Sequence, residues 1–207
     1  ILGGTSIQVL FPSIHTTWSC VSLSLILYYA FFCELKEKHD ILTGLFNRRA
    51  YEYEIQHLES LGYGAIIFFD VDDFKKINDQ FGHQYGDQCL STIAGLILKS
   101  FSGIGFCYRI GGDEFGVLSD KADEIDILNA ISLFINNLNS SREQDCNLPL
   151  VSMGYSIYHK SEGSITQAIS KADAQLYRYK NLHKQETKEP GKTNCNFSRS
   201  LTERTLH

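Results

Sequence analysis

The chain has 207 residues, with 19 Lys and Arg against 24 Asp and Glu, so its formal net charge is −5. A hydrophobic content of 43% is normal for a folded core and excludes an intrinsically disordered chain. The acidic balance argues against a protein whose main task is to bind nucleic acid, because that task needs a basic surface. Six cysteines without a C-x-x-C pair or metal-ligand spacing are typical of reduced thiols.

Residues 1–33 contain no Asp, Glu, Lys or Arg, so every such charge lies in the rest of the chain. The run from Phe11 to Cys33 is long enough to cross a hydrocarbon core of about 30 Å as a helix. A cleaved signal peptide would need a basic start and a small-residue cleavage site, and neither is present. We therefore expect a transmembrane helix, with a buried core helix as the alternative.

The charges that follow the apolar run predict its orientation. Lys36 and Lys38 come directly after it, and positive charge next to a membrane helix favours the cytoplasmic side. The first residue is Ile rather than Met, so we expect an N-terminally truncated fragment in which residues 1–33 end a multi-pass membrane region. Residues 34–39 would be a linker helix leading into a cytoplasmic domain.

The charged remainder predicts one α/β domain. Apolar side chains at spacings of three and four predict helices, and apolar runs or alternation predict strands. The predicted helices cover about residues 48–61, 74–78, 87–101, 128–138 and 165–179, with Asn47 as the first N-cap and Ser164–Gln167 as a capping box. The predicted strands cover residues 65–69, 106–110, 115–118 and 151–157, the last of them half-buried. This order indicates a mixed central sheet flanked by helices, followed by a polar, flexible tail over residues 187–207.

Carboxylates gather where the predicted apolar strands end. Asp70 follows the strand at residues 65–69, and the segment Gly111–Glu114 forms the tip of a predicted hairpin. If these two strands are neighbours, three carboxyl groups converge at one end of the sheet, where hard oxygen ligands suit Mg²⁺. The two glycines would let a ligand approach the backbone closely. A solvated strand end and an ordinary hairpin are the alternatives for each feature alone.

Four segments, in order, resemble the GGDEF domain of the diguanylate cyclase family. They are Asp40–Arg49, Asp70–Asp87, Arg109–Phe115 with an intact Gly-Gly-Asp-Glu-Phe signature, and Lys171–Tyr177. The resemblance covers about residues 40–186 and implies the palm-like α+β core shared with nucleotidyl cyclases and some polymerases. It implies that each domain binds one GTP. Two domains facing each other in a homodimer would then join two GTP into cyclic di-GMP and release two pyrophosphates.

The resemblance also implies roles for the residues at matching positions. Mg²⁺, with Mn²⁺ possible in its place, would be held by Asp70, the Val71 carbonyl, Asp113 and Glu114. Asp113 would also be the base for the 3′-hydroxyl, and Lys75 would offset charge on the transferred phosphoryl group. The nucleotide pocket would use the residues Asn78, His83, Asp87, Gly111, Gly112, Lys180 and Lys184.

Four of these positions have ordinary structural alternatives, and for Lys184 the alternative is a solvated cationic helix end. Asp87 can accept hydrogen bonds from guanine N1–H and the exocyclic amine, which would select GTP, but it could also be the N-cap of the next helix. Asn78 could be a turn residue, and His83 could be a loop histidine with a structural role.

The sequence departs from the family in two places. The closing helix usually ends in Lys-x-x-Gly-Arg-Asn, but here Lys180 is followed by Lys184, and lysine lacks the bidentate fork of arginine. The stretch Ser102–Gly105 lacks the Arg-x-x-Asp of product-inhibited members, so we expect no tight inhibitory site of that kind.

With the apolar head, the resemblance implies a cyclase at the bacterial inner membrane with its catalytic domain in the cytoplasm. A catalytically weak GTP-binding module that acts in signalling or interaction is the alternative. A polymerase palm is disfavoured, because the net charge is −5 and the sequence has no basic stripe for a nucleic acid.

Overall fold

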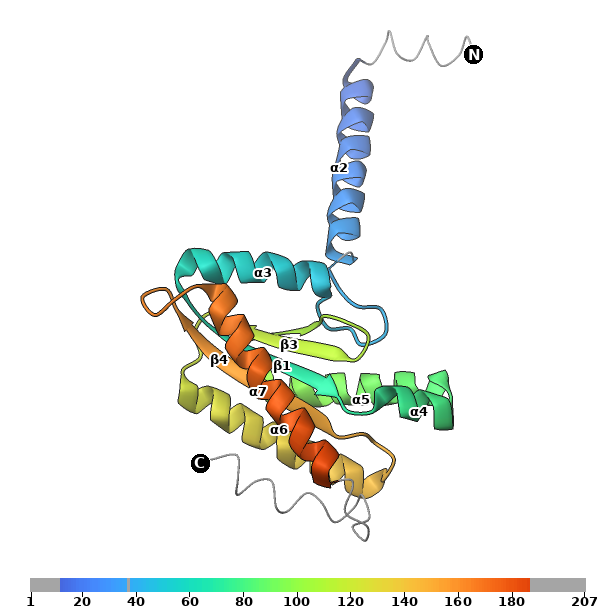
Figure 1. Ribbon diagram of the computed structural model, residues 1–207. Helices are drawn as coiled ribbons and strands as arrows, with labels where there is room; N and C mark the ends of the chain where they lie inside the picture. Colours follow the sequence, from blue (N-terminus) through green and yellow to red (C-terminus); the bar gives the residue numbers. More distant parts are fainter. Residues whose placement is uncertain (1–11, 37, 187–207) are drawn as a thin grey trace. The chain divides into compact units, whose positions relative to one another are not determined.

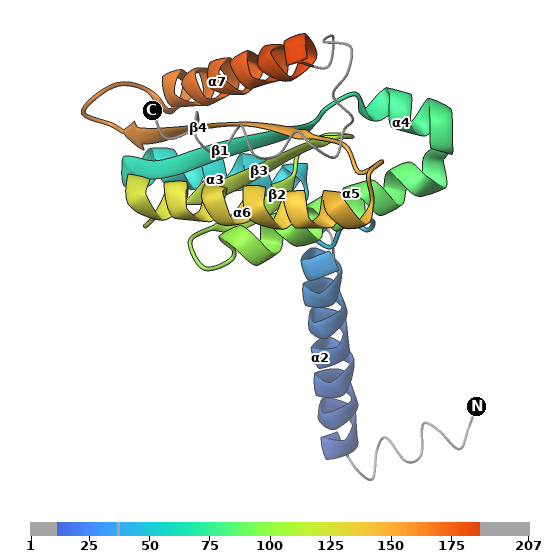
Figure 2. The same ribbon diagram turned by 90° about the horizontal axis from the view of Figure 1, so that it is seen from below.

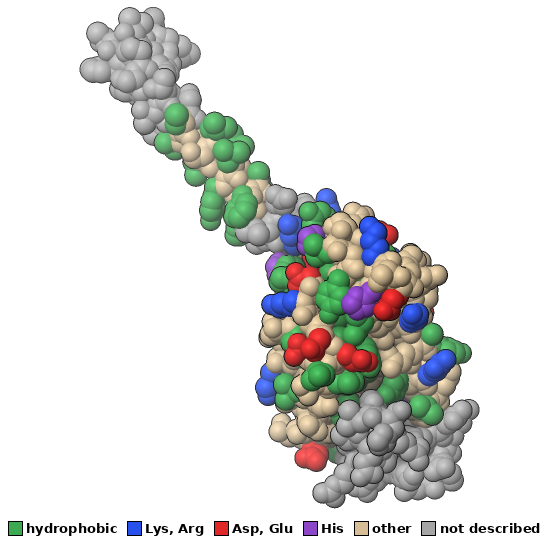
Figure 3. Space-filling view, turned by 90° about the vertical axis from the view of Figure 1, so that its left-hand side faces the viewer, with side chains coloured by type: hydrophobic (Ala, Val, Ile, Leu, Met, Phe, Trp, Pro, Cys, Tyr) green, Lys and Arg blue, Asp and Glu red, His purple; other side chains and the backbone are tan. Residues whose placement is uncertain are grey.

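The computed structural model describes residues 12–36 and 38–186, and the chain divides between His39 and Asp40 into two compact units. In the first unit, helix α2 spans Pro12–Lys36, and large apolar side chains between Val21 and Phe32 are exposed along it (Figure 3). In the two described ranges, no helix is both long enough and apolar enough to span a bilayer. The predicted membrane span is therefore not confirmed, and residues 1–11 lie outside what the structure describes.

The second unit contains a four-stranded sheet with helices on both faces (Figures 1 and 2). Its strands are β1 (Tyr63–Val71), β2 (Phe106–Arg109), β3 (Glu114–Ser119) and β4 (Val151–His159), in the order β2-β3-β1-β4. All three neighbouring pairs are antiparallel, so the prediction of a mixed sheet is wrong. The strands β1 and β2 do run in the same direction, but they are not adjacent because β3 lies between them.

The helices fall into two layers, which Figure 2 shows edge-on. Helices α5 (His83–Phe101) and α6 (Glu124–Gln144) cover one face, and α3 (Arg48–Leu61) and α7 (Ile165–Glu186) cover the other, while the short α4 (Phe74–Phe81) follows β1. Successive strand side chains point to opposite faces. Ile67 and Phe69 of β1 therefore pack against α5 and α6, whereas Ile66 packs toward α3 and α7. The continuous apolar run of β1 thus results from burial on both faces.

The caps predicted for two helices are confirmed, whereas α4, α5, α6 and α7 extend beyond their predicted ranges. The side chain of Asn47 accepts a hydrogen bond from the Ala50 N–H at the start of α3, and Gly62 ends that helix with φ 79°. Ser164 and Gln167 form the predicted reciprocal capping box before α7. One assignment is wrong: α5 begins at His83, so Asp87 lies one turn inside the helix and is not its N-cap.

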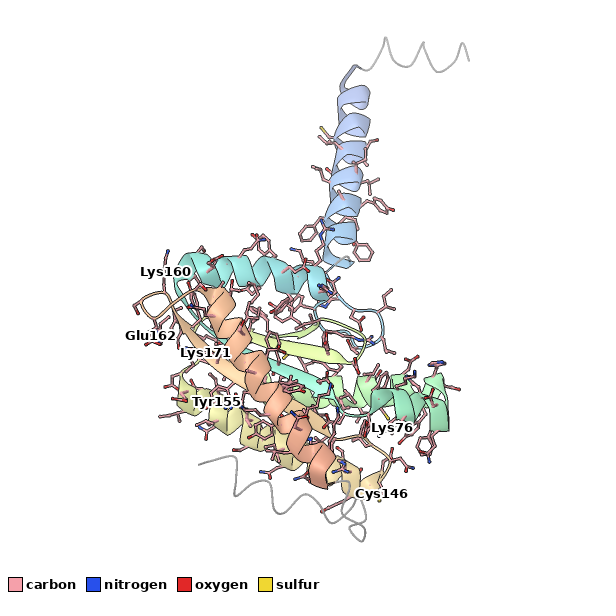
Figure 4. The ribbon with its side chains drawn as sticks, in the orientation of Figure 1. Lys76, Cys146, Tyr155, Lys160, Glu162 and Lys171 are labelled. Atoms are coloured by element: carbon pink, nitrogen blue, oxygen red, sulfur yellow. The ribbon has the colours of Figure 1, made fainter. Side chains whose placement is uncertain are left out.

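Two further expectations concern the cysteines and the C-terminal tail. Cys89 and Cys107 are free, as expected for reduced thiols. Cys146, which follows α6 (Figure 4), is disulfide-bonded, so the expectation of reduced thiols is wrong at this position. The predicted tail over residues 187–207 lies outside the described residues.

Helix α7 approaches the sheet closely because β4 carries a glycine beneath it. A Cβ atom on Gly154 would lie 2.1 Å from the Ala172 carbonyl oxygen, so only glycine fits between the strand and the helix. One residue further along β4, the Tyr155 N–H donates to Gln175 Oε1 at 2.7 Å. These contacts hold the middle of α7 against β4, and the helix then continues past the end of β1.

Candidate active site

The end of β1 and the tip of the β2–β3 hairpin lie side by side. Asp70 pairs with Glu114 in the β1–β3 register, and the Val71 N–H donates to the Asp113 carbonyl at 3.1 Å. The hairpin turn is closed by the Ile110 and Gly111 N–H groups, which donate to the Glu114 carbonyl at 2.9 and 3.3 Å. The expectation that these strand ends are neighbours is therefore confirmed.

Asp70 is a buried carboxylate with one close cationic partner. The residue is 7% exposed, and its Oδ1 lies 2.7 Å from Lys180 Nζ of α7. Burial raises the pKa of Asp70, and the nearby charges of Asp113 and Asp72 act in the same direction, whereas Lys180 opposes them. The net result is a carboxyl group whose ionised form is disfavoured, so additional positive charge at this place would be stabilised.

Lys180 carries the positive charge of this cluster. Burial lowers its pKa, but the hydrogen bond to Asp70 and the charges of Asp70, Asp72 and Asp113 outweigh burial, so the pKa lies above its usual 10.5. The ammonium group is therefore fully charged at neutral pH. One helical turn further on, Lys184 is exposed, and among the residues that the structure describes it forms no ion pair with the carboxylates.

The carboxylates fit a divalent cation that completes its coordination with other oxygens. Within the described ranges, no three His, Cys, Asp or Glu side chains form a ready-made metal cluster. Asp70, Asp113 and Glu114 nevertheless offer hard oxygen donors, and Lys180 already places a positive charge against Asp70. Mg²⁺ commonly uses one or two carboxylates plus phosphate oxygens and water. The residues therefore suit a cation that arrives with a nucleotide.

A second part of the site lies between α4 and α5. The side-chain oxygen of Asn78 is buried and has no hydrogen-bond partner among the residues that the structure describes. It packs against Gly86, where an added Cβ would lie only 2.0 Å away. Asp87 and His83 are both exposed on α5, so Asp87 is not the N-cap, and His83 is the first residue of the helix rather than a loop histidine. A buried orphan oxygen beside an exposed carboxylate is suited to binding a polar planar ligand.

Two adjacent lysines on α4 differ in their partners. Lys76 Nζ lies 2.9 Å from the carboxylate of Asp73, and its side chain, which Figure 4 labels, is exposed. Lys75 is exposed and makes no ion pair within the described part of the chain. Of the two cations, Lys75 is therefore the one available to an incoming anion.

A cavity of about 660 Å³ adjoins the carboxylates on the face of the sheet covered by α3 and α7. Asp70, Glu114 and Lys180 line it together with apolar side chains such as Phe68 and Tyr51. Burial raises the pKa of Tyr51 to about 12, so its hydroxyl stays neutral. The carboxylate cluster is therefore open to ligands from this side.

A sequence profile described as "Diguanylate cyclase, GGDEF domain" matches residues 37–186. The chain belongs to this family. The diguanylate cyclase VdcA of Vibrio cholerae is 32% identical over 149 residues, which are 69% of this chain and 44% of VdcA. The cyclic di-GMP phosphodiesterase NbdA of Pseudomonas aeruginosa is 42% identical over 92 residues, 42% of this chain and 12% of NbdA. The chain thus matches less than half of the length of either protein.

The fold of the GGDEF domain agrees with solved structures. The crystal structure of the GGDEF domain of DgcB from Caulobacter crescentus, in complex with c-di-GMP, has a TM-score of 0.61 and 28% identity. The superposition covers 70% of this chain and 90% of the DgcB domain. The α+β architecture with an antiparallel sheet between helices is therefore shared.

Arg109 has a position in this GGDEF domain that the sequence analysis did not assign. Its guanidinium donates to the Gly112 carbonyl at 2.8 Å and to the Asp40 carboxylate at 3.0 Å. Burial acts to raise the pKa of Asp40, but hydrogen bonds from Thr43 and Arg109 outweigh it, and the pKa lies below its usual 3.8. Arg109 therefore ties the start of the domain to the hairpin tip. Its place two residues before the Gly-Gly turn was the available sequence signal.

Proposed function

We propose that this chain is a diguanylate cyclase that condenses two GTP into cyclic di-GMP and releases two pyrophosphates. The pairing of Asp70 with Glu114 across β1 and β3, with Lys180 at 2.7 Å from Asp70, is the observation that carries the proposal. Attack of a 3′-hydroxyl on an α-phosphate increases negative charge on the phosphoryl oxygens and on the leaving pyrophosphate. A carboxylate-held cation flanked by lysines supplies compensating charge at that position.

The proposed cation is Mg²⁺, or Mn²⁺ in its place, held by Asp70, the Val71 carbonyl, Asp113 and Glu114. When bound, it would lower the pKa of the 3′-hydroxyl and neutralise charge on the phosphates. Asp113 would accept the hydroxyl proton. Lys75 would bind the transferred phosphoryl group, because it is exposed and has no ion pair within the described residues.

The nucleotide would lie between the hairpin tip and the side chains of Asn78 on α4 and Asp87 on α5. The orphan oxygen of Asn78 and the carboxylate of Asp87 can both accept hydrogen bonds from guanine, whose N1–H and exocyclic amine are donors. Gly111 and Gly112 would let the phosphates approach the hairpin backbone. Lys180 and Lys184 would contact the β- and γ-phosphates, with Lys180 exchanging its contact with Asp70 for phosphate oxygens, whereas His83 would lie at the rim of the pocket.

The reaction requires two copies of the domain. Each GTP provides one 3′-hydroxyl and one α-phosphate, so two phosphodiester bonds form, two α–β anhydride bonds break and two protons are released. One domain has one set of carboxylates and would bind one GTP. A homodimer of facing GGDEF domains is therefore the proposed active form.

A catalytically weak GTP-binding module is the second candidate. NbdA, which is named as a phosphodiesterase, matches this chain over 92 residues, so similarity in this region also occurs in a protein named for another activity. A module that only binds GTP would not need Asp70, Asp113, Glu114 and Lys75 together. The presence of all four favours the cyclase.

Product analysis with the purified chain, Mg²⁺ and GTP distinguishes the two candidates. A cyclase yields cyclic di-GMP and two pyrophosphates per product, whereas a binding module retains GTP unchanged. Asp113→Asn should abolish product without unfolding the domain. Lys75→Ala should lower turnover at least tenfold, while the matched variant Lys76→Ala removes only an exposed ion pair and should leave turnover unchanged. Equal turnover in the two lysine variants would remove Lys75 from the site.

We also propose that the chain is anchored at the inner face of the bacterial cytoplasmic membrane, where GTP is available to the domain. The absence of Asp, Glu, Lys and Arg from residues 1–33 and the exposed apolar side chains from Val21 to Phe32 support this location. Alkaline carbonate extraction of expressing cells tests it. Release of the chain into the soluble fraction would contradict membrane anchoring.

A further inference from the structure

A buried histidine connects the last turn of α7 to the end of β1. His183 Nδ1 lies 2.5 Å from Asp72 Oδ2 and 3.1 Å from Ser152 Oγ. Ser152 Oγ also donates to the Asp72 carboxylate, at 2.8 and 2.9 Å from its two oxygens. His183 is 6% exposed and Ser152 is completely buried. The three side chains therefore form a closed polar cluster inside the domain.

The same three residue types serve as a nucleophile, base and orienting acid in hydrolases, but their geometry here is different. In a hydrolase the serine and the acid contact opposite nitrogens of the ring. Here Ser152 and Asp72 both contact Nδ1. Ser152 is also inaccessible to a substrate, so this cluster does not perform nucleophilic catalysis.

The cluster lies next to Asp70 without including it. Ser152 is the residue directly opposite Asp70 in the β1–β4 register, and Asp72 lies two residues beyond Asp70. His183 lies three residues after Lys180 on α7, so both side chains extend from the same side of the helix. A carboxylate can only accept hydrogen bonds, so the short contact to Asp72 places a proton on Nδ1.

Without a second attachment of this part of α7, the ammonium group of Lys180 would have no fixed position for binding a phosphate. Its side chain has several rotatable bonds, and holding it in one geometry costs conformational entropy. A second attachment of the same helical turn reduces the motion of the backbone that carries it. The hydrogen bonds of His183 provide such an attachment, to Ser152 on β4 and to Asp72 directly after β1.

We propose that His183 is a positioning residue for the triphosphate. By bonding to Asp72 and Ser152, it fixes the last turn of α7 so that Lys180 faces the carboxylates and the phosphates bound there. The proposal rests on the proposed function, because it assigns Lys180 to GTP. It goes further by naming a residue that never touches the nucleotide but sets how tightly it binds.

The test compares His183→Ala, His183→Asn and His183→Gln in the purified chain. The amide nitrogen of Asn can replace Nδ1 of histidine, whereas that of Gln is displaced toward Nε2. We expect His183→Ala and His183→Gln to raise KM for GTP, and Kd for a non-hydrolysable GTP analogue with Mg²⁺, about tenfold. His183→Asn should restore both within about threefold of wild type, and kcat should change less than twofold in all three.

Two controls separate positioning from folding. Leu182→Ala changes an exposed neighbour in the same turn and should leave KM unchanged. In a Lys180→Ala background, His183→Ala should raise KM no further, because its effect acts through Lys180. A merely structural role would instead lower kcat with the active fraction and leave KM unaltered, and that result would overturn the assignment, as would an unchanged Kd.

Failure of the proposed function would look different. A wild-type chain that binds the GTP analogue but forms no cyclic di-GMP would refute the cyclase, while Kd in the variants would still decide the role of His183. If His183→Ala does not fold, the Asn and Gln variants give the same decision. Equal Kd values in those two variants would overturn the assignment.

Discussion

The contact between Asn78 and Gly86 leads to a prediction for the variant Gly86→Ala. The added methyl group should weaken GTP binding while the domain still folds. A Cβ atom added at Gly86 would lie 2.0 Å from Asn78 Oδ1, whereas ordinary contact begins near 3.4 Å. The Asn78 oxygen must therefore move by about 1.4 Å in Gly86→Ala. A displacement of about 1 Å in a binding group is large enough to lose a hydrogen bond and a large part of turnover.

The helix itself should tolerate this change. Alanine is more favourable than glycine within a helix by roughly 1 kcal/mol, which offsets part of the cost of moving Asn78. We expect Gly86→Ala to keep the fold, with a change in Tm of only a few degrees. The loss of one guanine hydrogen bond, worth about 1.4 kcal/mol, should raise KM for GTP roughly tenfold.

Gly95→Ala provides the matched control in the same helix. Nothing lies within 4 Å of a Cβ added at Gly95, so the substitution should raise Tm slightly and leave KM unchanged. Initial rates of cyclic di-GMP formation over a range of GTP concentrations give KM for both variants, and thermal unfolding gives their Tm. An unchanged KM in Gly86→Ala would refute the reasoning that Asn78 reads the guanine base.

Three other predictions concern the carboxylates, the hairpin and the product. Burial raises the pKa of Asp70 above its usual 3.8, so the ionised carboxylate destabilises the fold at neutral pH. Without metal, Asp70→Asn should therefore raise Tm at pH 7.5, and by progressively less toward pH 4. An equal gain in Tm at both pH values would contradict this explanation. Arg109→Ala removes the hydrogen bonds to Gly112 and Asp40 and should lower kcat about tenfold. Arg48→Ala removes only an exposed ion pair with Glu52 and should change neither kcat nor Tm. Because Ser102–Gly105 lacks the charges of an inhibitory site, submicromolar cyclic di-GMP should leave the initial rate unaltered, and inhibition would count against that reading.

The hairpin and the end of β1 were predictable from the sequence because their signals are local. An apolar run followed by Asp70, and a glycine-rich turn between two short apolar runs, predict strand ends on their own. The expectation that these ends are neighbours needed only one assumption about strand pairing. The observed register, with Asp70 opposite Glu114, satisfies it.

The partners of the polar side chains were not predictable in the same way. Asp72 and His183 are 111 positions apart in the chain, and nothing near either residue indicates the other. At the end of α7 the sequence pointed only to Lys180 and Lys184, the second in place of an arginine, and gave no sign of a role for His183. Hydrogen bonds between distant segments depend on how helices dock, which periodicity does not determine.

The strand β4 shows how docking changes the meaning of a pattern. The alternation of apolar residues over 151–157 predicts a strand with one face exposed, but Ser152 is 0% and Ser156 is 8% exposed. The alternate positions hold Ser152, Gly154 and Ser156, whose small side chains let α7 lie directly on the strand. A larger side chain at Gly154 would move α7 away and carry Lys180 and His183 with it. The small residues that suggest a solvent-facing surface therefore create the helix contact on which the proposed phosphate-binding residues of α7 depend.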